Sequence, residues 1–315
     1  MRYLFSVGLA TTLEFVFSSY STHTDGLIYS EVCRSLSSTV PAEAYPIFMD
    51  GSAGLEPVSM GLLYLICYFG FDFSVVNIAL NSLFIYLALR LYCGSILREV
   101  LVIIFLLTNF YFVLLLFGLY KLKVAAIFLV LAFLSNAYSN SNVKRIVVGL
   151  SVFSHLQILP IFLSNYTSRF WTDRSVRIKL IFIFSFLSLF IIIFFPILKS
   201  VGDYFIFRAD AYKESGVFSW KLLLLYFAHV LAFGFALDIF ILFFILILLA
   251  SQIGDGRLII LYFLYLLTYL SIKVKGSLNG RSILFLGFLW VFSFWKAIPL
   301  IHSLVYGYSY FLDLD

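Results

Sequence analysis

Long apolar runs recur along the whole chain and are separated by short polar breaks. Ten runs stand out, at about residues 3–19, 57–72, 75–93, 99–119, 124–138, 146–164, 180–198, 222–251, 257–272 and 282–298. A helix of about 20 residues crosses a hydrocarbon core of roughly 30 Å, and a bundle of such helices satisfies its own backbone hydrogen bonds. The pattern therefore predicts an all-α fold, a polytopic transmembrane helical bundle of about 8–10 membrane segments.

Two polar intervals interrupt this pattern and carry several charged residues each. The longer covers residues 20–56, and the second covers residues 199–221. We find no soluble domain, no linker and no internal repeat of fixed period in the sequence. The run after Arg2 lacks an A-x-A-like cleavage site and precedes further membrane segments, so we expect it to be a retained first helix. We expect one integral membrane domain over 1–315, with the two intervals as extracytoplasmic loops.

The composition agrees with a membrane protein. Hydrophobic residues make up 63% of the chain, charged residues 12%, and the mean hydropathy is +1.06, outside the range of soluble domains. The net charge of +5 comes from scattered Lys and Arg, which favours contact with lipid head groups and argues against nucleic-acid binding. Cys33, Cys67 and Cys93 are widely spaced, so we expect packing cysteines rather than a disulfide framework or a metal site.

The distribution of basic residues bears on the topology. Ten simple crossings with Arg2 inside place more Lys and Arg outside than inside, against the usual bias. If runs 57–72 and 146–164 are re-entrant or interfacial helices, more Lys and Arg lie on the inside, which is closer to the usual distribution. That arrangement also places the main candidate site residues on the outer face, namely Asp25, Glu56, Lys121, Arg208 and Arg281.

Charged residues at the edges of apolar runs are the candidates for chemistry, because a charge near lipid is costly and usually faces a cavity. Asp25 and Tyr29 share one face if their segment is helical; a solvated acid beside an interfacial tyrosine is the alternative. Glu56 directly precedes Pro57 and an apolar run. An acid there can be catalytic, or it can simply favour the positive start of a helix.

Further along, Lys121 and Lys123 interrupt the stretch 99–138, so the chain is expected to bend or break there. The two lysines either mark a substrate path or are loop residues that reach the head groups. His155 lies in an apolar run without a second ligand at metal spacing, which argues against a metal site and favours a buried, hydrogen-bonded histidine. Glu14 and Asp238 also lie within apolar runs, as proton-coupling or structural residues.

Two arginines lie in polar segments beside membrane runs. Arg208 stands in Phe207-Arg208-Ala209-Asp210, and Arg281 follows Asn279-Gly280. A guanidinium suits bidentate recognition of phosphate, and a local ion pair with a neighbouring carboxylate is the alternative.

Taken in their order along the chain, these candidate residues resemble the motifs of the EpsG-like branch of Wzy-type polysaccharide and O-antigen polymerases. Members of that branch have an early D-x-x-x-Y motif, here Asp25 and Tyr29, and an E-P dipeptide that opens an apolar run, here Glu56 and Pro57. A basic R-Q-x-x-A element, a later histidine and a late arginine follow in such proteins. Lys121-Leu-Lys-Val-Ala125, His155 and Arg281 occupy these places, with lysine for the arginine and leucine for the glutamine.

The resemblance implies a GT-C-like membrane glycosyltransferase in the bacterial inner membrane, with its active site facing the periplasm or exterior. Such an enzyme transfers a polyprenyl-diphosphate-linked glycan onto the next lipid-linked repeat unit. It implies Asp25 or Glu56 as general base with His155 as a partner, and Tyr29 as a substrate contact. Diphosphate contacts would come from the basic candidates Lys121, Arg208, Arg281 and Arg34. The scheme requires no metal and no other cofactor.

Two other classes of function remain open at this stage. A lipid-linked oligosaccharide flippase or other transporter would need charged positions that are accessible from both membrane faces, although inverted repeats are absent from the sequence. A noncatalytic assembly subunit would tolerate loss of Asp25 and Glu56. For a polymerase, the expected partners are the lipid-linked substrates, membrane lipid, a flippase and a chain-length regulator, with no nucleic acid.

Overall fold

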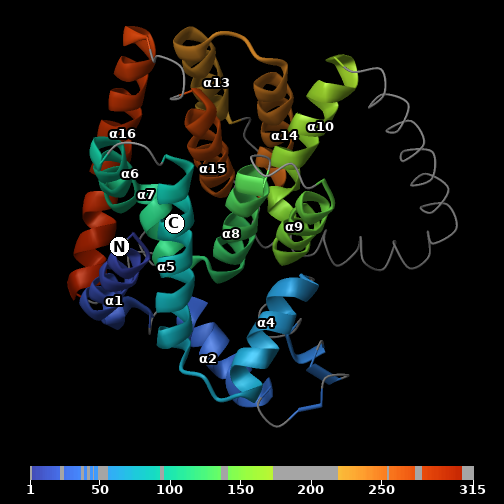
Figure 1. The fold of residues 1–315 in the computed structure, drawn as a ribbon, viewed down its shortest axis with the longest axis vertical. Coiled ribbons are helices and arrows are strands. Elements are labelled where there is room, and N and C mark those ends of the chain that lie inside the picture. The colour runs from blue at the N-terminus through green and yellow to red at the C-terminus, as the bar shows by residue number, and fades with distance from the viewer. Residues whose placement is uncertain are drawn as a thin grey trace, which may run out of the picture. The chain divides into compact units, whose positions relative to one another are not determined.

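The fold is helical throughout the part of the chain that the structure describes (Figure 1). This computed structural model describes residues 2–21, 25–36, 39–40, 43–44, 46–48, 56–92, 96–135, 141–172, 219–253, 255–273 and 279–306. Within these ranges all regular elements are α-helices or 3-10 turns, which confirms the predicted all-α class. The run at 180–198 and the interval 199–221, except for its last residues, lie outside the described residues.

The chain packs as two compact units, of which the first comprises Met1–Ile158, Leu266–Leu278 and Leu286–Asp315. Its complete elements are α1 (Arg2–Ser21), α2 (Asp25–Leu36), α4 (Pro57–Tyr68), α5 (Phe73–Leu91), α6 (Ile96–Thr108), α7 (Phe110–Gly118), α8 (Tyr120–Ser135), α9 (Ser141–Ser154) and the 3-10 turn η2 (Leu156–Ile158). Helix α5 packs against α1 and α8, α8 packs against α9, and α4 packs against α2 and α9. These contacts bring together segments from the first half of the sequence.

The second unit comprises Leu159–Tyr265 and Asn279–Phe285. It contains α10 (Leu159–Thr172), α13 (Trp220–Phe233), α14 (Leu237–Ile253), the first part of α15 (Asp255–Lys273) and the first residues of α16 (Gly280–Tyr306). The run at 222–251, expected as one stretch, is two helices. Gly234 ends α13 with a φ of 87°, a left-handed conformation that glycine adopts without a steric penalty, and its N–H donates to the Val230 carbonyl.

Two helices in the described ranges are long and apolar enough to cross a membrane, Phe73–Leu91 and Gly280–Ile298. A third candidate is the pair Glu99–Thr108 and Phe110–Gly118, if this pair forms one span with a bend of 75°. The bend begins at Asn109, whose side chain accepts hydrogen bonds from the backbone N–H groups of Tyr111 and Phe112 and so starts a new helix. A larger number of crossings remains a prediction.

The chain breaks again two residues before Lys121, as the sequence predicted. Helix α7 ends at Gly118, Leu119 has non-helical dihedral angles, and α8 begins at Tyr120. Lys121 and Lys123 therefore both belong to the start of a helix rather than to a loop. This corrects the alternative in which they were loop residues that reach the head groups.

Cys33 and Cys67 form a disulfide, contrary to the expectation of packing cysteines. Residues 25–36, expected within a loop, form helix α2, which packs against α4 and brings the two Cα atoms to 4.9 Å. That distance lies within the usual range for a disulfide. Spacing along the sequence could not reveal this pairing, because it depends on how α2 lies on α4. Cys93 lies outside the described residues.

Candidate functional site

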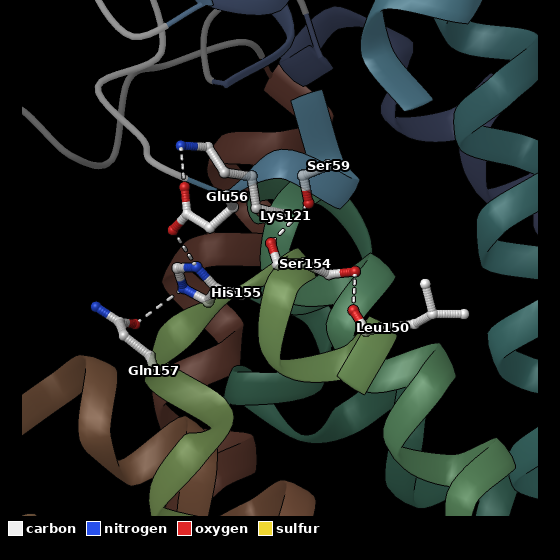
Figure 2. Close-up of polar contacts among 7 residues, drawn as sticks. All are labelled: Glu56, Ser59, Lys121, Leu150, Ser154, His155 and Gln157. Atoms are coloured by element: carbon white, nitrogen blue, oxygen red, sulfur yellow. Dashed lines mark hydrogen bonds and ion pairs between the residues drawn. The ribbon is translucent and has the colours of Figure 1, made fainter. Parts of the chain in front are cut away.

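A glutamate, a lysine and a histidine meet in the first unit, where the start of α4, the start of α8 and the end of α9 come together (Figure 2). The Glu56 carboxylate contacts the His155 Nδ1 at 3.0 Å through Oε1 and the Lys121 Nζ at 3.4 Å through Oε2. All three were candidates from the sequence, although Glu56 is 65 residues from Lys121 and 99 from His155. The fold thus assembles an acid, a base and a cation at one point.

Glu56 is directed into this cluster by the residue that follows it. A residue before proline is driven to extended dihedral angles, and Glu56 has a φ of −81° and a ψ of 101° at the N-cap of α4. Pro57 occupies the first helical turn, where its missing N–H costs nothing. The Glu56 side chain makes no capping bond to α4. Its carboxylate contacts the lysine and the histidine instead, so a helix-start role does not account for its contacts.

His155 lies in a break between two helices. Pro160 stands in the first turn of α10 and cannot donate a backbone hydrogen bond, so the helix α9 does not continue through this segment. The chain turns through η2, in which the Ile158 N–H donates to the His155 carbonyl. The imidazole is therefore presented from a non-helical residue, whose side chain is 17% exposed.

Serine hydroxyls fix the helices around the cluster. The Ser59 hydroxyl of α4 donates to the Ser154 carbonyl at the end of α9, at 2.6 Å (Figure 2). The Ser151 hydroxyl of α9 donates to the Ala125 carbonyl of α8, at 2.8 Å. Carbonyls at a helix end have no partner within the helix. The Ser59 hydroxyl therefore supplies the hydrogen bond that the Ser154 carbonyl lacks within α9, next to His155. Together these bonds join the three helices that carry the charged residues.

The two ring nitrogens of His155 face oxygen atoms. Nδ1 lies against the Glu56 carboxylate, and Nε2 lies 3.1 Å from the Gln157 Oε1. A carboxylate only accepts, so Nδ1 carries a hydrogen and donates it to Glu56. At Nε2 two arrangements satisfy the contact: the imidazolium donates to the amide oxygen, or the amide is rotated and its N–H donates to a neutral Nε2. In the second arrangement Nε2 has a lone pair that can take a proton.

Lys121 contacts an aromatic ring, and the residue before it packs in an aromatic group. Its Nζ lies 5.2 Å from the centre of the Phe48 ring, within the range of a cation–π contact. Its neighbour Tyr120 packs with Tyr29, whose ring centre lies 5.1 Å away, and with Phe73. The aromatic contacts fix the first turn of α8, so Lys121 reaches Glu56 from an anchored backbone.

The cluster is enclosed but still reachable from outside. The side chains of Glu56 and Lys121 are 10% and 13% exposed. Burial alone would raise the pKa of Glu56, but the hydrogen bond from His155 and the positive charges of Lys121 and His155 outweigh it and lower this pKa below its usual value. Glu56 is therefore a carboxylate at neutral pH, and it stabilises positive charge on both partners.

The other predicted site residues lie elsewhere or outside the described residues. Tyr29 is 4% exposed and packs in the aromatic group with Phe73 and Tyr120. Asp25 begins α2, four residues before Tyr29 in the same helix as expected, and its side chain lies outside the description. Arg34 is exposed near the end of α2, Arg281 is exposed near the start of α16 in the second unit, and Arg208 lies outside the described residues.

Sequence reasoning missed several residues that complete the cluster. Gln157 was one, although a polar residue two positions after a histidine in an apolar run was an available signal. Ser59 and Ser154 gave no such signal, because serine is common at helix ends. In the described ranges no group of three or more His, Cys, Asp or Glu side chains could hold a metal ion.

A scan of protein-family models, a search of curated proteins and a search of solved structures each gave no match to this chain.

Proposed function

We propose that this protein is a membrane glycosyltransferase, a polysaccharide polymerase that transfers a polyprenyl-diphosphate-linked glycan onto the next lipid-linked repeat unit. The observation that carries the proposal is the meeting of Glu56, His155 and Lys121. These residues combine a candidate base, a group that orients it and a cation beside them. The sequence resemblance to EpsG-like polymerases rests on the same three positions, together with Asp25, Tyr29 and Arg281.

The reaction divides naturally among these side chains. An acceptor hydroxyl oxygen attacks the anomeric carbon of the donor sugar, and the bond from that carbon to the diphosphate oxygen breaks. The hydroxyl proton passes to Nε2 of a neutral His155, and the electron pair leaves with the polyprenyl diphosphate. Lys121 stabilises the negative charge that grows on the departing oxygen.

Glu56 acts through His155 in this scheme. Its carboxylate holds the Nδ1 hydrogen, which leaves Nε2 as the basic nitrogen and stabilises the imidazolium that forms. A carboxylate with a lowered pKa is itself a weak base, which favours this division over Glu56 as the base. Arg281, Arg34 and Arg208 remain further candidates for the diphosphate, and Asp25 and Tyr29 for the acceptor.

The proposed location is the bacterial inner membrane, with the site at its outer face. Disulfides persist in oxidising compartments and are rare in the cytosol, so the Cys33–Cys67 bond supports an outward position for α2 and α4. Helix α4 has 12 residues, about 18 Å, too short to cross the membrane and suited to a re-entrant or interfacial segment. We propose a polytopic GT-C-like bundle on this basis, with a flippase and a chain-length regulator as partners.

Purified protein in lipid vesicles tests the proposal, with polyprenyl-diphosphate-linked repeat units as substrate. We expect wild type to give a ladder of glycan lengths and to release polyprenyl diphosphate in step with each bond formed. His155→Gln should slow both by about 10²–10⁴-fold, the usual contribution of a general base. The control His302→Gln changes an exposed histidine of α16 and should keep the wild-type rate. A wild-type preparation that is folded and makes no polymer from any repeat unit of its own organism would refute the proposal.

A further inference from the structure

A buried acid and a buried base face one another in the first unit, outside the candidate site. Lys123 is 1% exposed and Glu14 is 5% exposed. Asn77 of α5 joins them: its Nδ2 donates to the Glu14 Oε2 at 2.7 Å, and the Lys123 Nζ donates to its Oδ1. The network thus connects α1, α5 and α8 through one asparagine.

Lys123 also reaches across the break between α7 and α8. Its Nζ donates to the Leu116 carbonyl, which lies in the last turn of α7. Carbonyls in a last turn have no partner within the helix, and they carry the negative end of the helix dipole. Lys123 of α8 therefore provides a hydrogen-bond donor to a carbonyl at the end of α7, across the break at Leu119. This contact fixes the start of α8 relative to the end of α7.

The side chains of Lys121 and Lys123 project from opposite sides of α8. Two residues along an α-helix correspond to a rotation of about 200°. Lys121 contacts Glu56 in the site, whereas Lys123 contacts Asn77 and the Leu116 carbonyl. Any rotation or shift of this first turn would move both lysines at once.

Stability alone does not require such a pair. Two buried ionisable side chains lose hydration, and apolar side chains of similar volume often fill the same space without loss of stability. Hydrogen bonds depend on direction more than apolar packing does. The bonds from Lys123 to Asn77 and to the Leu116 carbonyl therefore fix one rotation of α8 about its axis. We propose that Glu14, Asn77 and Lys123 are positioning residues that set where Lys121 stands relative to Glu56. The activity part of the test rests on the proposed function.

The test compares single variants with a charge-neutral double variant of the full-length protein. Glu14→Gln and Lys123→Met each remove one of the two ionisable side chains that Asn77 bridges, and each should lower the melting temperature. The double variant Glu14→Gln/Lys123→Met removes both charges, so its melting temperature should return towards the wild-type value. The rate of polymer formation should stay at least about tenfold below wild type, because nothing then joins α8 to the Leu116 carbonyl.

Hydrogen exchange gives a second readout that does not depend on the reaction. Backbone amides of residues 121–124 should exchange faster in the double variant than in wild type. Asn77→Ala is a second variant for the case that the double variant does not fold, because it removes the bridge and keeps both charges. The matched control Asn81→Ala changes a fully buried asparagine one turn along α5 and should leave exchange at 121–124 unchanged.

Recovery of both the wild-type exchange and the wild-type rate in the double variant would show that the pair is only structural and would overturn the inference. Fast exchange at residues 121–124 together with a low rate in a thermally stable double variant supports it. If wild type forms no polymer, the proposed function fails, and the exchange comparison alone decides the positioning inference.

Discussion

Replacing Glu56 with glutamine separates the charge of the site from its shape. Glutamine has nearly the same size and keeps an oxygen that can accept the Nδ1 hydrogen of His155. It removes the negative charge that faces Lys121 at 3.4 Å and His155 at 3.0 Å. The variant therefore tests whether the carboxylate, rather than the packing of the residue, serves the reaction.

The expected loss of stability is small. A hydrogen bond to a charged group contributes about 1.5–3 kcal/mol and a neutral one about 0.5–1.5 kcal/mol, so Glu56→Gln should destabilise by about 1–2 kcal/mol. In a chain of this length that shift lowers the melting temperature by only a few degrees. Lys121 keeps its cation–π contact with Phe48, and Ser59 still joins α4 to α9. The fold should therefore survive the change.

The expected loss of activity is much larger. If Glu56 orients His155 and stabilises the imidazolium, its charge accounts for most of the base catalysis, so polymerisation should slow by about 10²–10⁴-fold. Each factor of ten corresponds to about 1.4 kcal/mol of activation free energy, so the barrier rises by about 3–5 kcal/mol. The effect on the barrier thus exceeds the effect on stability.

The assay uses a strain that lacks the gene and carries wild type, Glu56→Gln or the control Glu99→Gln. Glu99 also forms an ion pair, but with Arg2, so the control changes a paired carboxylate whose partner is not one of the three site residues. Immunoblots establish equal membrane levels, and gels of the extracted polysaccharide give the chain-length ladder. We expect single-repeat product from Glu56→Gln and a full ladder from Glu99→Gln. A full ladder from Glu56→Gln at the normal protein level would refute the role of this carboxylate.

Four further predictions concern Glu56, Lys121 and the Cys33–Cys67 disulfide. Because the folded-state pKa of Glu56 lies below its usual value of 4.5, the carboxylate adds stability above that value and loses it as the pH falls through the lowered pKa. The melting temperature of wild type should therefore fall more steeply than that of Glu56→Gln below about pH 5, and parallel curves would contradict the pKa shift. Lys121→Met should slow polymerisation more than Lys121→Arg in vesicles, because arginine keeps the charge beside the departing diphosphate; equal rates would exclude that role. Replacing Cys33 and Cys67 together with serine should cost about 3–4 kcal/mol of stability in the chain-entropy model, read from denaturant unfolding in detergent. After brief reduction, a membrane-impermeant thiol reagent should label these cysteines in intact cells, and labelling only after lysis would contradict the outward position.

Glu56, Lys121 and His155, which lie together in the structure, were singled out from the sequence because charge near lipid is costly. Glu56 and Lys121 were noticed as charges at the edges of apolar runs, and His155 as a titratable residue inside one. That reasoning needs no knowledge of the fold, since a polar residue in such surroundings requires a partner. The same reasoning could not show that the three are partners of one another. Their contacts depend on how α4, α8 and α9 pack.

Helix lengths and pairings were less predictable. The apolar run at 222–251 gave no sign of its division, because the hydrophobic pattern continues through Gly234. Asn77 lies in a helix of spanning length and was not among the candidate residues, yet it bridges the buried Glu14 and Lys123. Both features depend on local dihedral angles or on the rotation of a neighbouring helix, which the hydrophobic pattern does not contain. The Cys33–Cys67 pairing depends in the same way on the packing of α2 against α4.

The contacts of Glu56 change the role that its position suggested. From the sequence it was a candidate general base, but a carboxylate that accepts a hydrogen bond from an imidazole and faces a lysine holds its charge more firmly and takes a proton less readily. The same contacts leave His155 as the candidate proton acceptor of the proposed reaction, because its Nδ1 hydrogen is held by Glu56 and its Nε2 faces Gln157. Lys121 lowers the pKa of Glu56, and in the proposed reaction the same charge would stabilise the leaving group. Loss of Lys121 should for this reason weaken both leaving-group departure and the orientation of His155, so its effect and that of Glu56→Gln should be less than additive in a double-mutant cycle.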